Sequence, residues 1–251
     1  MAFPRMLYAH RGAPAERPEN TLPSFHRAVE LGVDAIETDV HMTRDGHVVI
    51  AHDPTARRMA GVDVAWRDID ITTAKRFDLG WGFVAPDGTR PFAGQGIRIP
   101  TLEEALRACP DMRFNIDLKQ AKPSMVGRVL ELLHRHRAEE RVTLASFQTA
   151  TLLEVRRRGF GGDTAMAQAE VAAFAAMPVA VWRRLPFVAS CAQVPVRAGP
   201  LKLASRWFID KCHAAGIRVD FWTVNDPAEA TRLFALGADG VMTDDPAHVR
   251  R

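Results

Sequence analysis

The sequence predicts an α/β fold, a (β/α)8 barrel with a small insertion after the second strand region. Short apolar runs alternate with longer helical patterns along nearly all of the 251 residues. These runs are near-continuously apolar, as buried parallel strands are, and polar residues gather at their carboxyl ends. There are about eight of them, the number of strands that a closed barrel requires.

The expected strands follow these runs in chain order, and they are residues 6–9, 35–40, 113–118, 142–146, 164–167, 188–194, 219–223 and 240–243. Helical patterns separate most of them. One covers residues 21–31 and stops at Gly32, a residue type that commonly ends helices, and another covers residues 101–108. An open doubly wound sheet would alternate in the same way. The apolar strands with polar carboxyl ends favour the barrel.

Residues 53–100 interrupt this rhythm between the second strand region and the helix at 101–108. They hold Trp66, Trp81, a Pro-Asp-Gly turn and two Gly-x-Gly pairs, which is typical of a loop-rich excursion. Barrels routinely occupy roughly 250 residues as one unit. We therefore expect a single domain over residues 1–251, with the insertion lying over the barrel mouth.

Charge and cysteine content exclude several classes of protein. Lys and Arg number 33 against 30 Asp and Glu, and they are scattered, whereas nucleic-acid binders cluster them on one stripe. Three cysteines without a Cys-x-x-Cys pair argue against disulfides and thiolate metal sites. No apolar run approaches the ~20 residues of a membrane span, and no secretory signal opens the chain. We expect a cytoplasmic protein without a membrane anchor or nucleic-acid partner; the oligomeric state stays open.

Carboxylates are concentrated at the ends of two expected strands. Residues two apart on a strand point the same way, so Glu37 and Asp39 share one face, and Asn115, Asp117 and Lys119 share another. Burying three carboxylates together is unfavourable unless a cation lies among them. Oxygen ligands favour a hard divalent ion, Mg²⁺ or Ca²⁺. Lys119 and Arg11 would then hold an anionic substrate beside the metal.

Two histidines are expected to join this cluster. His10 ends the first strand. The Asp-Gly pair at 45–46 signals a hairpin with a two-residue turn, in which Arg44 pairs with His47 and Asp39 lies opposite His52. Two imidazoles beside a metal and two cations suit the cleavage of a phosphate ester, because one can take a proton while the other gives one.

Taken together, these residues resemble the glycerophosphodiester phosphodiesterases. The stretches that carry the resemblance are spread over the whole chain, and they are residues 10–12, 18–21, 37–40, 43–46, 52–53, 99–104, 146–147, 221–225 and 239–244. Each alone is a weak signal, but their combination is highly specific.

The resemblance implies a TIM barrel that uses a divalent metal to hydrolyse glycerophosphodiesters, such as glycerophosphocholine, to sn-glycerol 3-phosphate and an alcohol. Carried over by position, it implies that His10 and His52 are the acid/base pair and that Arg11 and Lys119 contact the phosphate. It also implies that Glu37 and Asp39, together with Asp117, bind the metal, and that Trp222 forms a wall of the substrate pocket. Asp117 departs from the pattern, since the family usually has Glu there. The shorter Asp side chain requires the ion to shift toward this strand or a water to bridge the gap.

Some assignments stay open at this point. A lysophospholipase D is the alternative enzyme, for which the insertion would supply an apolar lip from Met59, Trp66, Trp81, Phe83 and Phe92. These residues could equally form a small core of the insertion itself. A silent barrel that only binds a phosphodiester is disfavoured, because both histidines and all three carboxylates are retained. Asn20 and Thr21 are either caps of the helix that follows or positioning residues of the site.

Overall fold

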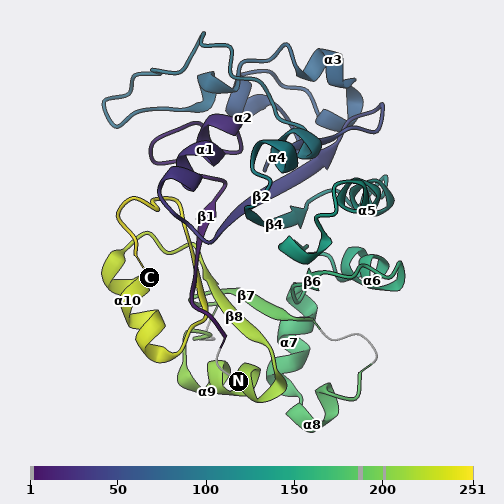
Figure 1. Cartoon of the computed structure of the whole chain (residues 1–251), viewed down its shortest axis with the longest axis vertical. Coiled ribbons are helices and arrows are strands. Elements are labelled where there is room, and N and C mark those ends of the chain that lie inside the picture. The colour runs from purple at the N-terminus through teal and green to yellow at the C-terminus, as the bar shows by residue number, and fades with distance from the viewer. Residues whose placement is uncertain (1–2, 186–188, 200–201, 251) are drawn as a thin grey trace.

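Parallel strands form a nearly closed barrel in the computed structural model, which describes residues 3–185, 189–199 and 202–250. Over these residues eight parallel strands follow the order β6-β5-β4-β2-β1-β9-β8-β7, and β3 pairs with β2 outside the ring. The bounds are β1 Met6–His10, β2 Ala35–Met42, β3 Val48–Ile50, β4 Arg113–Leu118, β5 Val142–Ala145, β6 Asp163–Thr164, β7 Cys191–Pro195, β8 Arg218–Trp222 and β9 Gly240–Thr243. Between β6 and β7 the ring is bridged by a parallel contact of Ala165 with Cys191. The predicted barrel is confirmed (Figure 1).

The strand bounds agree with the predictions except along the β6–β7 seam. β4 and β9 have the expected bounds, and β1 and β2 extend one and two residues further. β6 covers only Asp163–Thr164, since beyond it the chain contacts β7 through an isolated bridge of Ala165 with Cys191 before α7 begins at Gln168. β7 begins at Cys191, and Val188, the start expected for this strand, lies outside the described residues.

Helices follow most strands and cover the outside of the barrel (Figure 1). The α-helices are α1 Leu22–Glu30, α2 Arg57–Ala60, α3 Ile71–Ala74, α4 Leu102–Ala108, α5 Val126–Arg135, α6 Thr149–Arg157, α7 Gln168–Ala176, α8 Val179–Trp182, α9 Arg206–Ala215 and α10 Pro227–Leu236, and the 3-10 helices are η1 Trp66–Asp68, η2 Leu79–Gly82 and η3 Glu139–Arg141. Thr21 caps α1 by accepting from the Ser24 N–H at 3.4 Å. Thr101 and Glu104 form a reciprocal capping box at the start of α4.

The hairpin of β2 and β3 differs from the predicted register by one residue. β3 runs antiparallel to β2 with Val40 opposite Ile50. The prediction of a two-residue Asp-Gly turn that sets Asp39 opposite His52 is therefore wrong. The turn has one more residue, because Gly46 adopts the left-handed conformation (φ 83°) that completes a three-residue hairpin loop.

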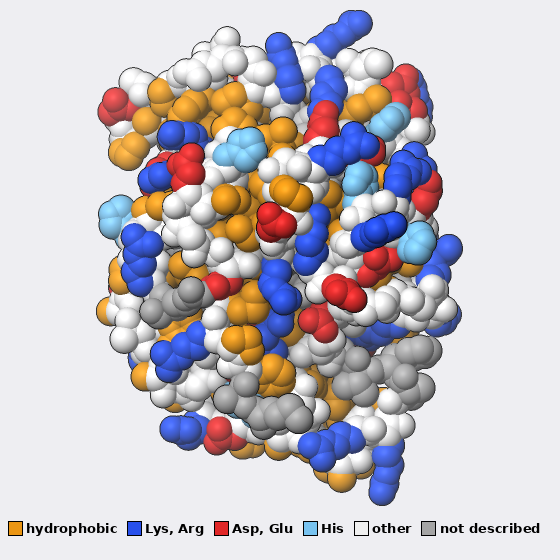
Figure 2. Space-filling model, viewed as in Figure 1, with side chains coloured by type: hydrophobic (Ala, Val, Ile, Leu, Met, Phe, Trp, Pro, Cys, Tyr) orange, Lys and Arg blue, Asp and Glu red, His pale blue; other side chains and the backbone are white. Residues whose placement is uncertain are grey.

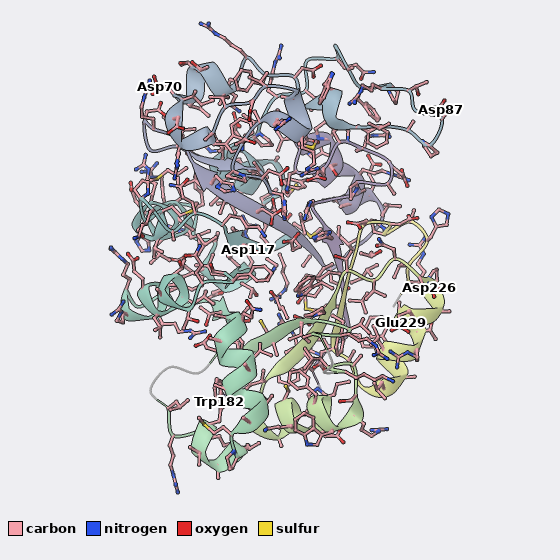
Figure 3. All side chains as sticks on the ribbon, turned by 180° about the vertical axis from the view of Figure 1, so that it is seen from behind. Asp70, Asp87, Asp117, Trp182, Asp226 and Glu229 are labelled. Carbon is pink, nitrogen blue, oxygen red and sulfur yellow. The ribbon has the colours of Figure 1, made fainter. Side chains whose placement is uncertain are left out.

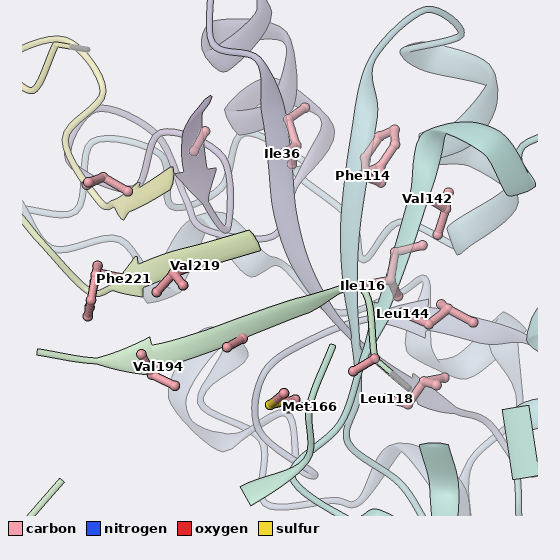
Figure 4. Packing of buried hydrophobic residues seen from close by; sticks show 14 of the residues in the cluster. Ile36, Phe114, Ile116, Leu118, Val142, Leu144, Met166, Val194, Val219 and Phe221 are labelled. Atoms are coloured by element: carbon pink, nitrogen blue, oxygen red, sulfur yellow. The ribbon is translucent and has the colours of Figure 1, made fainter. Parts of the chain in front are cut away.

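Alternation along the strands separates an apolar outer face from a polar inner one. Outward side chains such as Ile36, Phe114, Ile116 and Val219 pack in one large buried cluster with residues of the surrounding helices (Figure 4). The inner face carries the charged residues predicted for the site. Within the described residues, no helix has the length and apolar content to cross a membrane.

Residues 53–100 hold α2, η1, α3 and η2 beyond the ends of α1 and α4 (Figure 1). They form an apolar cluster with Val49 of β3 and Ala51, in which Trp66, 1% exposed, is buried with Leu79 and Ile99. The hairpin tip fastens this segment, since Arg44 donates to Asp70 at 2.6 Å. Its description as an insertion into one domain stays a prediction.

Candidate active site

The ends of three neighbouring strands bring the predicted charged residues together. His10 of β1 lies opposite Glu37 of β2, while Glu37 and Asp39 lie opposite Asn115 and Asp117 of β4. All five line a cavity of about 400 Å³. Asp117 lies near the middle of the molecule in Figure 3. Parallel pairing therefore brings together side chains that are far apart in the sequence.

Two cations lie among the carboxylates. Lys119 Nζ is 2.9 Å from Asp39 Oδ1 and 2.7 Å from Asp117 Oδ2, so it bridges β2 and β4. On the other side of Asp39, Arg11 Nε lies 3.3 Å from Oδ2. Asn20 Nδ2 donates to the same oxygen at 3.0 Å. Asp39 thus has three partners that fix its carboxylate. Of the two residues left open by the sequence, Asn20 therefore belongs to the site, whereas Thr21 is the cap of α1.

Burial and charge give the carboxyls different proton affinities. Burial and the neighbouring Asp39 raise the pKa of Glu37 to about 8. Burial also raises the pKa of Asp117, although Lys119 opposes the shift. For Asp39 burial acts in the same direction, but the charges of Lys119 and Arg11 outweigh it and lower the pKa. Three buried carboxyls exceed the charge of the two cations, so without a further cation Glu37 keeps its proton over most of the neutral pH range.

A divalent cation fits this donor set. Asp117 Oδ1 is buried and accepts no hydrogen bond from any residue that the structure describes. Within the described residues, no three His, Cys, Asp or Glu side chains already converge as a ligand cluster, because Lys119 lies between two of the carboxylates. An ion placed near Glu37 and Asp117 would offset the excess negative charge and use the unpaired oxygen. Carboxylate oxygens are the ligands that Mg²⁺ and Ca²⁺ prefer.

His10 is anchored by an acidic residue from the other end of the chain. Its Nδ1 donates to Asp244 Oδ1 at 2.6 Å, and its Nε2 lies 3.8 Å from Glu37 Oε2. Asn225 donates to the second oxygen of Asp244 at 2.8 Å. Burial would lower the pKa of His10, but Glu37 and the bond to Asp244 outweigh it and raise the pKa. Asp244 was missed as a site residue, although it follows directly after the strand at 240–243.

His52 reaches the cavity after the chain has left the hairpin ladder. Asp39 lies opposite Ala51, whose N–H donates to the Asp39 carbonyl at 2.9 Å. The His52 ring lines the cavity and its Nδ1 donates to Asp53 Oδ1 at 2.8 Å. His41 Nε2 donates to the His52 carbonyl at 3.2 Å. The predicted proximity of His52 to the carboxylates is found, but not through the predicted pairing.

The opposite half of the cavity is apolar. Trp222 at the end of β8 packs edge to face on Phe147, with ring centroids 5.9 Å apart. Beyond them the lining comes from α7 and from the chain around β7, with mostly small or apolar side chains, which include Met166, Val171, Ala172, Ala175, Val194 and Leu203. Trp222 therefore lies at the border between the two halves.

The apolar lip expected from the insertion does not line the cavity. Trp66 is buried in the cluster within residues 53–100. Phe83 packs on Phe92 with ring centroids 4.9 Å apart, and Arg90 covers the ring of Trp81 at 4.0 Å. Of the two alternatives for these residues, the structure favours packing among residues 53–100, and the apolar surface of the cavity comes from other parts of the chain.

Basic side chains do not gather into one stripe on the face shown in Figure 2. Lys and Arg are interspersed there with acidic and apolar side chains. This face therefore offers no continuous basic track for a nucleic acid backbone.

Comparison with known proteins gives a consistent result. A model of the Glycerophosphoryl diester phosphodiesterase family matches residues 10–248. A glycerophosphodiester phosphodiesterase from Caldanaerobacter subterraneus is 29% identical over 257 residues, covering 96% of this chain and 94% of that protein. A human lysophospholipase D is 30% identical, covering 96% of this chain and 84% of that protein. The crystal structure of a glycerophosphodiester phosphodiesterase from Thermotoga maritima superposes with a TM-score of 0.74 at 28% identity, covering 96% of this chain and 95% of that one.

Proposed function

Because this chain belongs to the Glycerophosphoryl diester phosphodiesterase family, a family of hydrolases, we propose that it hydrolyses glycerophosphodiesters to sn-glycerol 3-phosphate and an alcohol. The observation that carries the proposal is the pair of anchored imidazoles. In His10 and in His52 a carboxylate engages Nδ1, and both rings line the same cavity. Nε2 of each ring is then the nitrogen available to the substrate.

In the proposed reaction the two imidazoles act as general base and general acid. One removes a proton from the nucleophile, either water or the substrate's own 2-hydroxyl, as that oxygen bonds to phosphorus, and the other protonates the oxygen of the departing alcohol as its bond to phosphorus breaks. Attack by the 2-hydroxyl gives a cyclic phosphate, which water then opens. Arg11 and Lys119 bind the phosphoryl oxygens, since a guanidinium and an ammonium at this depth stabilise negative charge. Trp222 forms the wall against which the glycerol or the alcohol rests. Asp244 and Asp53 hold the rings in the orientation that this exchange requires.

Glu37, Asp39 and Asp117 are the proposed ligands of one divalent cation, Mg²⁺ or Ca²⁺. When bound, such an ion polarises the phosphoryl group as a Lewis acid. The support is the unpaired buried Asp117 Oδ1 and the raised pKa of Glu37. The side chain of Asp117 is one methylene shorter than the Glu of the family pattern. Its carboxylate is oriented by Lys119, whose Nζ lies 2.7 Å from Oδ2.

Hydrolysis of glycerophosphocholine tests this proposal. We expect the purified protein to release choline and sn-glycerol 3-phosphate, to lose activity in EDTA, and to regain it with Mg²⁺ or Ca²⁺. Activity that survives exhaustive chelation would overturn the metal assignment alone. Absence of turnover with any glycerophosphodiester, with and without added cations, would overturn the function.

The apolar half of the cavity favours a second candidate, cleavage of lysophospholipids by a lysophospholipase D reaction. The surface formed by α7 and the chain around β7 could take an acyl chain while the phosphate lies on the charged half. Turnover of lysophosphatidylcholine compared with glycerophosphocholine separates the two substrates. A kcat/KM that is higher for the lysophospholipid would favour this candidate.

A further inference from the structure

Arg58 of α2 joins two parts of the site that the strands do not connect. It donates hydrogen bonds to Asp53 and to Glu19. Asp53 is the hydrogen-bond partner of His52, and Glu19 is that of Arg11. We propose that Arg58 is a positioning residue, which fixes the His52 ring relative to the Arg11 guanidinium. The proposal rests on the proposed function, in which these two groups act on one phosphate.

On the histidine side, Arg58 completes a chain of hydrogen bonds. Its Nε donates to Asp53 Oδ2 at 2.5 Å, while the other carboxylate oxygen accepts from His52 Nδ1 at 2.8 Å. The Asp53 carbonyl in turn accepts from Trp66 Nε1 at 2.9 Å. The side chain and the backbone carbonyl of Asp53 are therefore both fixed, and the His52 imidazole is held in turn by its hydrogen bond to the Asp53 carboxylate.

On the arginine side, Arg58 competes with Arg11 for one acidic side chain. Its two terminal nitrogens each donate to a different oxygen of Glu19 at 2.8 Å. Arg11 NH1 donates to Oε1 of the same carboxylate at 3.1 Å. Among the described residues no hydrogen bond is formed by Arg11 NH2. Arg58 thus keeps Glu19 from binding Arg11 with both oxygens, which leaves part of the Arg11 guanidinium for the phosphate.

The shape of the guanidinium explains why an arginine occupies this position. A single exposed ion pair contributes little, and the Arg58 side chain is 44% exposed. The planar fork, however, reaches three carboxylate oxygens on two residues at once. Lysine would keep the charge at one point and could not span Asp53 and Glu19 in the same geometry. Position, more than charge, is the property that this residue supplies.

Arg57 provides a matched control, since it is the neighbouring exposed arginine of the same helix. With glycerophosphocholine, we expect Arg58→Met and Arg58→Lys to lower kcat by roughly 10-fold to 100-fold with KM changed by less, because misplacing a reacting group costs about this much. Arg57→Met should retain the wild-type kcat. In a double-mutant cycle, Asp53→Asn should add little to Arg58→Met, because both remove the same restraint on His52.

Thermal unfolding of each variant separates positioning from simple attachment of the insertion. If Arg58→Lys folds with the wild-type melting temperature and keeps the wild-type kcat, the proposal is overturned. Additive losses from Asp53→Asn and Arg58→Met would overturn it as well. Failure of the proposed function is a different outcome, in which the wild-type protein itself does not hydrolyse glycerophosphocholine.

Discussion

The two halves of the cavity are built on different principles. At the ends of β1, β2 and β4, hydrogen bonds and ion pairs fix the polar side chains. Asp39, for example, has three partners, Arg11, Asn20 and Lys119. Along α7, residues such as Ala172 leave open apolar surface with no polar partner to satisfy. Changes on the charged side should therefore alter the reaction rate, whereas changes on the apolar side should alter which substrate is accepted.

The largest effect is expected on the charged side, from His10→Ala. Loss of a general acid or base lowers kcat by roughly 10²-fold to 10⁴-fold. Steady-state hydrolysis of glycerophosphocholine measures this loss. His26→Ala is the control, because His26 is exposed on α1. Full hydrolysis by the His10 variant would remove His10 from the acid/base pair and weaken the contrast between the two halves.

A smaller and selective effect is expected on the apolar side, from Ala172→Glu. A carboxylate there would oppose the entry of an acyl chain, because burying an unpaired charge is unfavourable. We expect kcat/KM to fall about 10-fold or more for lysophosphatidylcholine. For glycerophosphocholine kcat/KM should change less than about 2-fold, because the reacting groups lie in the other half of the cavity. Ala173→Glu, on the exposed surface of the same helix and outside the cavity lining, is the matched variant. Equal losses for both substrates would contradict the division into halves.

The smallest effect is expected away from both halves, at the start of α4. Burial would raise the pKa of Glu104, but its bonds to Lys75 and to the Thr101 N–H outweigh this and lower the pKa. A carboxyl with a lowered pKa stabilises the fold above its unfolded pKa, and this stability is lost as pH falls through the folded pKa. Glu104→Gln keeps an acceptor for the cap but removes the charge. We expect a loss of about 0.5 kcal/mol at pH 7 that shrinks toward pH 3.

Urea unfolding between pH 3 and pH 7 measures this difference. Glu140→Gln, at an exposed carboxyl, should leave the free energy of unfolding unchanged at every pH. A loss that is independent of pH for Glu104→Gln would contradict the role of its charge. Neither variant should alter the preference between the two substrates, which confines substrate choice to the cavity.

Strand alternation made much of the site predictable from the sequence. Glu37 and Asp39 share the inner face of β2, because a period of two fixes the direction of each side chain. Asp117 lies on β4, and Lys119 comes directly after the end of that strand. The hairpin register was predicted wrongly because Asp-Gly suits both a two-residue turn and the last two positions of a three-residue loop. A register shift of one residue moves each side chain of β3 to the opposite face of the sheet relative to β2.

The long-range contacts that hold the two histidines follow from no local pattern, although the Asp53 partner of His52 is its neighbour in the chain. Asp244 meets His10 only because β9 closes the ring beside β1, and Arg58 meets Glu19 only because residues 53–100 fold back over the first loop. Such contacts depend on three-dimensional closure and on the packing of an irregular segment, neither of which hydrophobic periodicity encodes. The apolar wall of α7 was missed for the same reason, since small alanines carry no signal of a cavity.

Adjacency of the first and last strands has a consequence for how the protein comes into being. His10 and Asp244 are separated by 234 positions, and β1 pairs with β9 directly. Chains are synthesised from the amino end, so His10 leaves the ribosome long before its partner exists. A nascent chain that stops before β9 would already carry both histidines and every carboxylate of the cluster, yet its first imidazole would have no anchor. On the proposed role of His10, the enzyme would gain activity only when the barrel is complete.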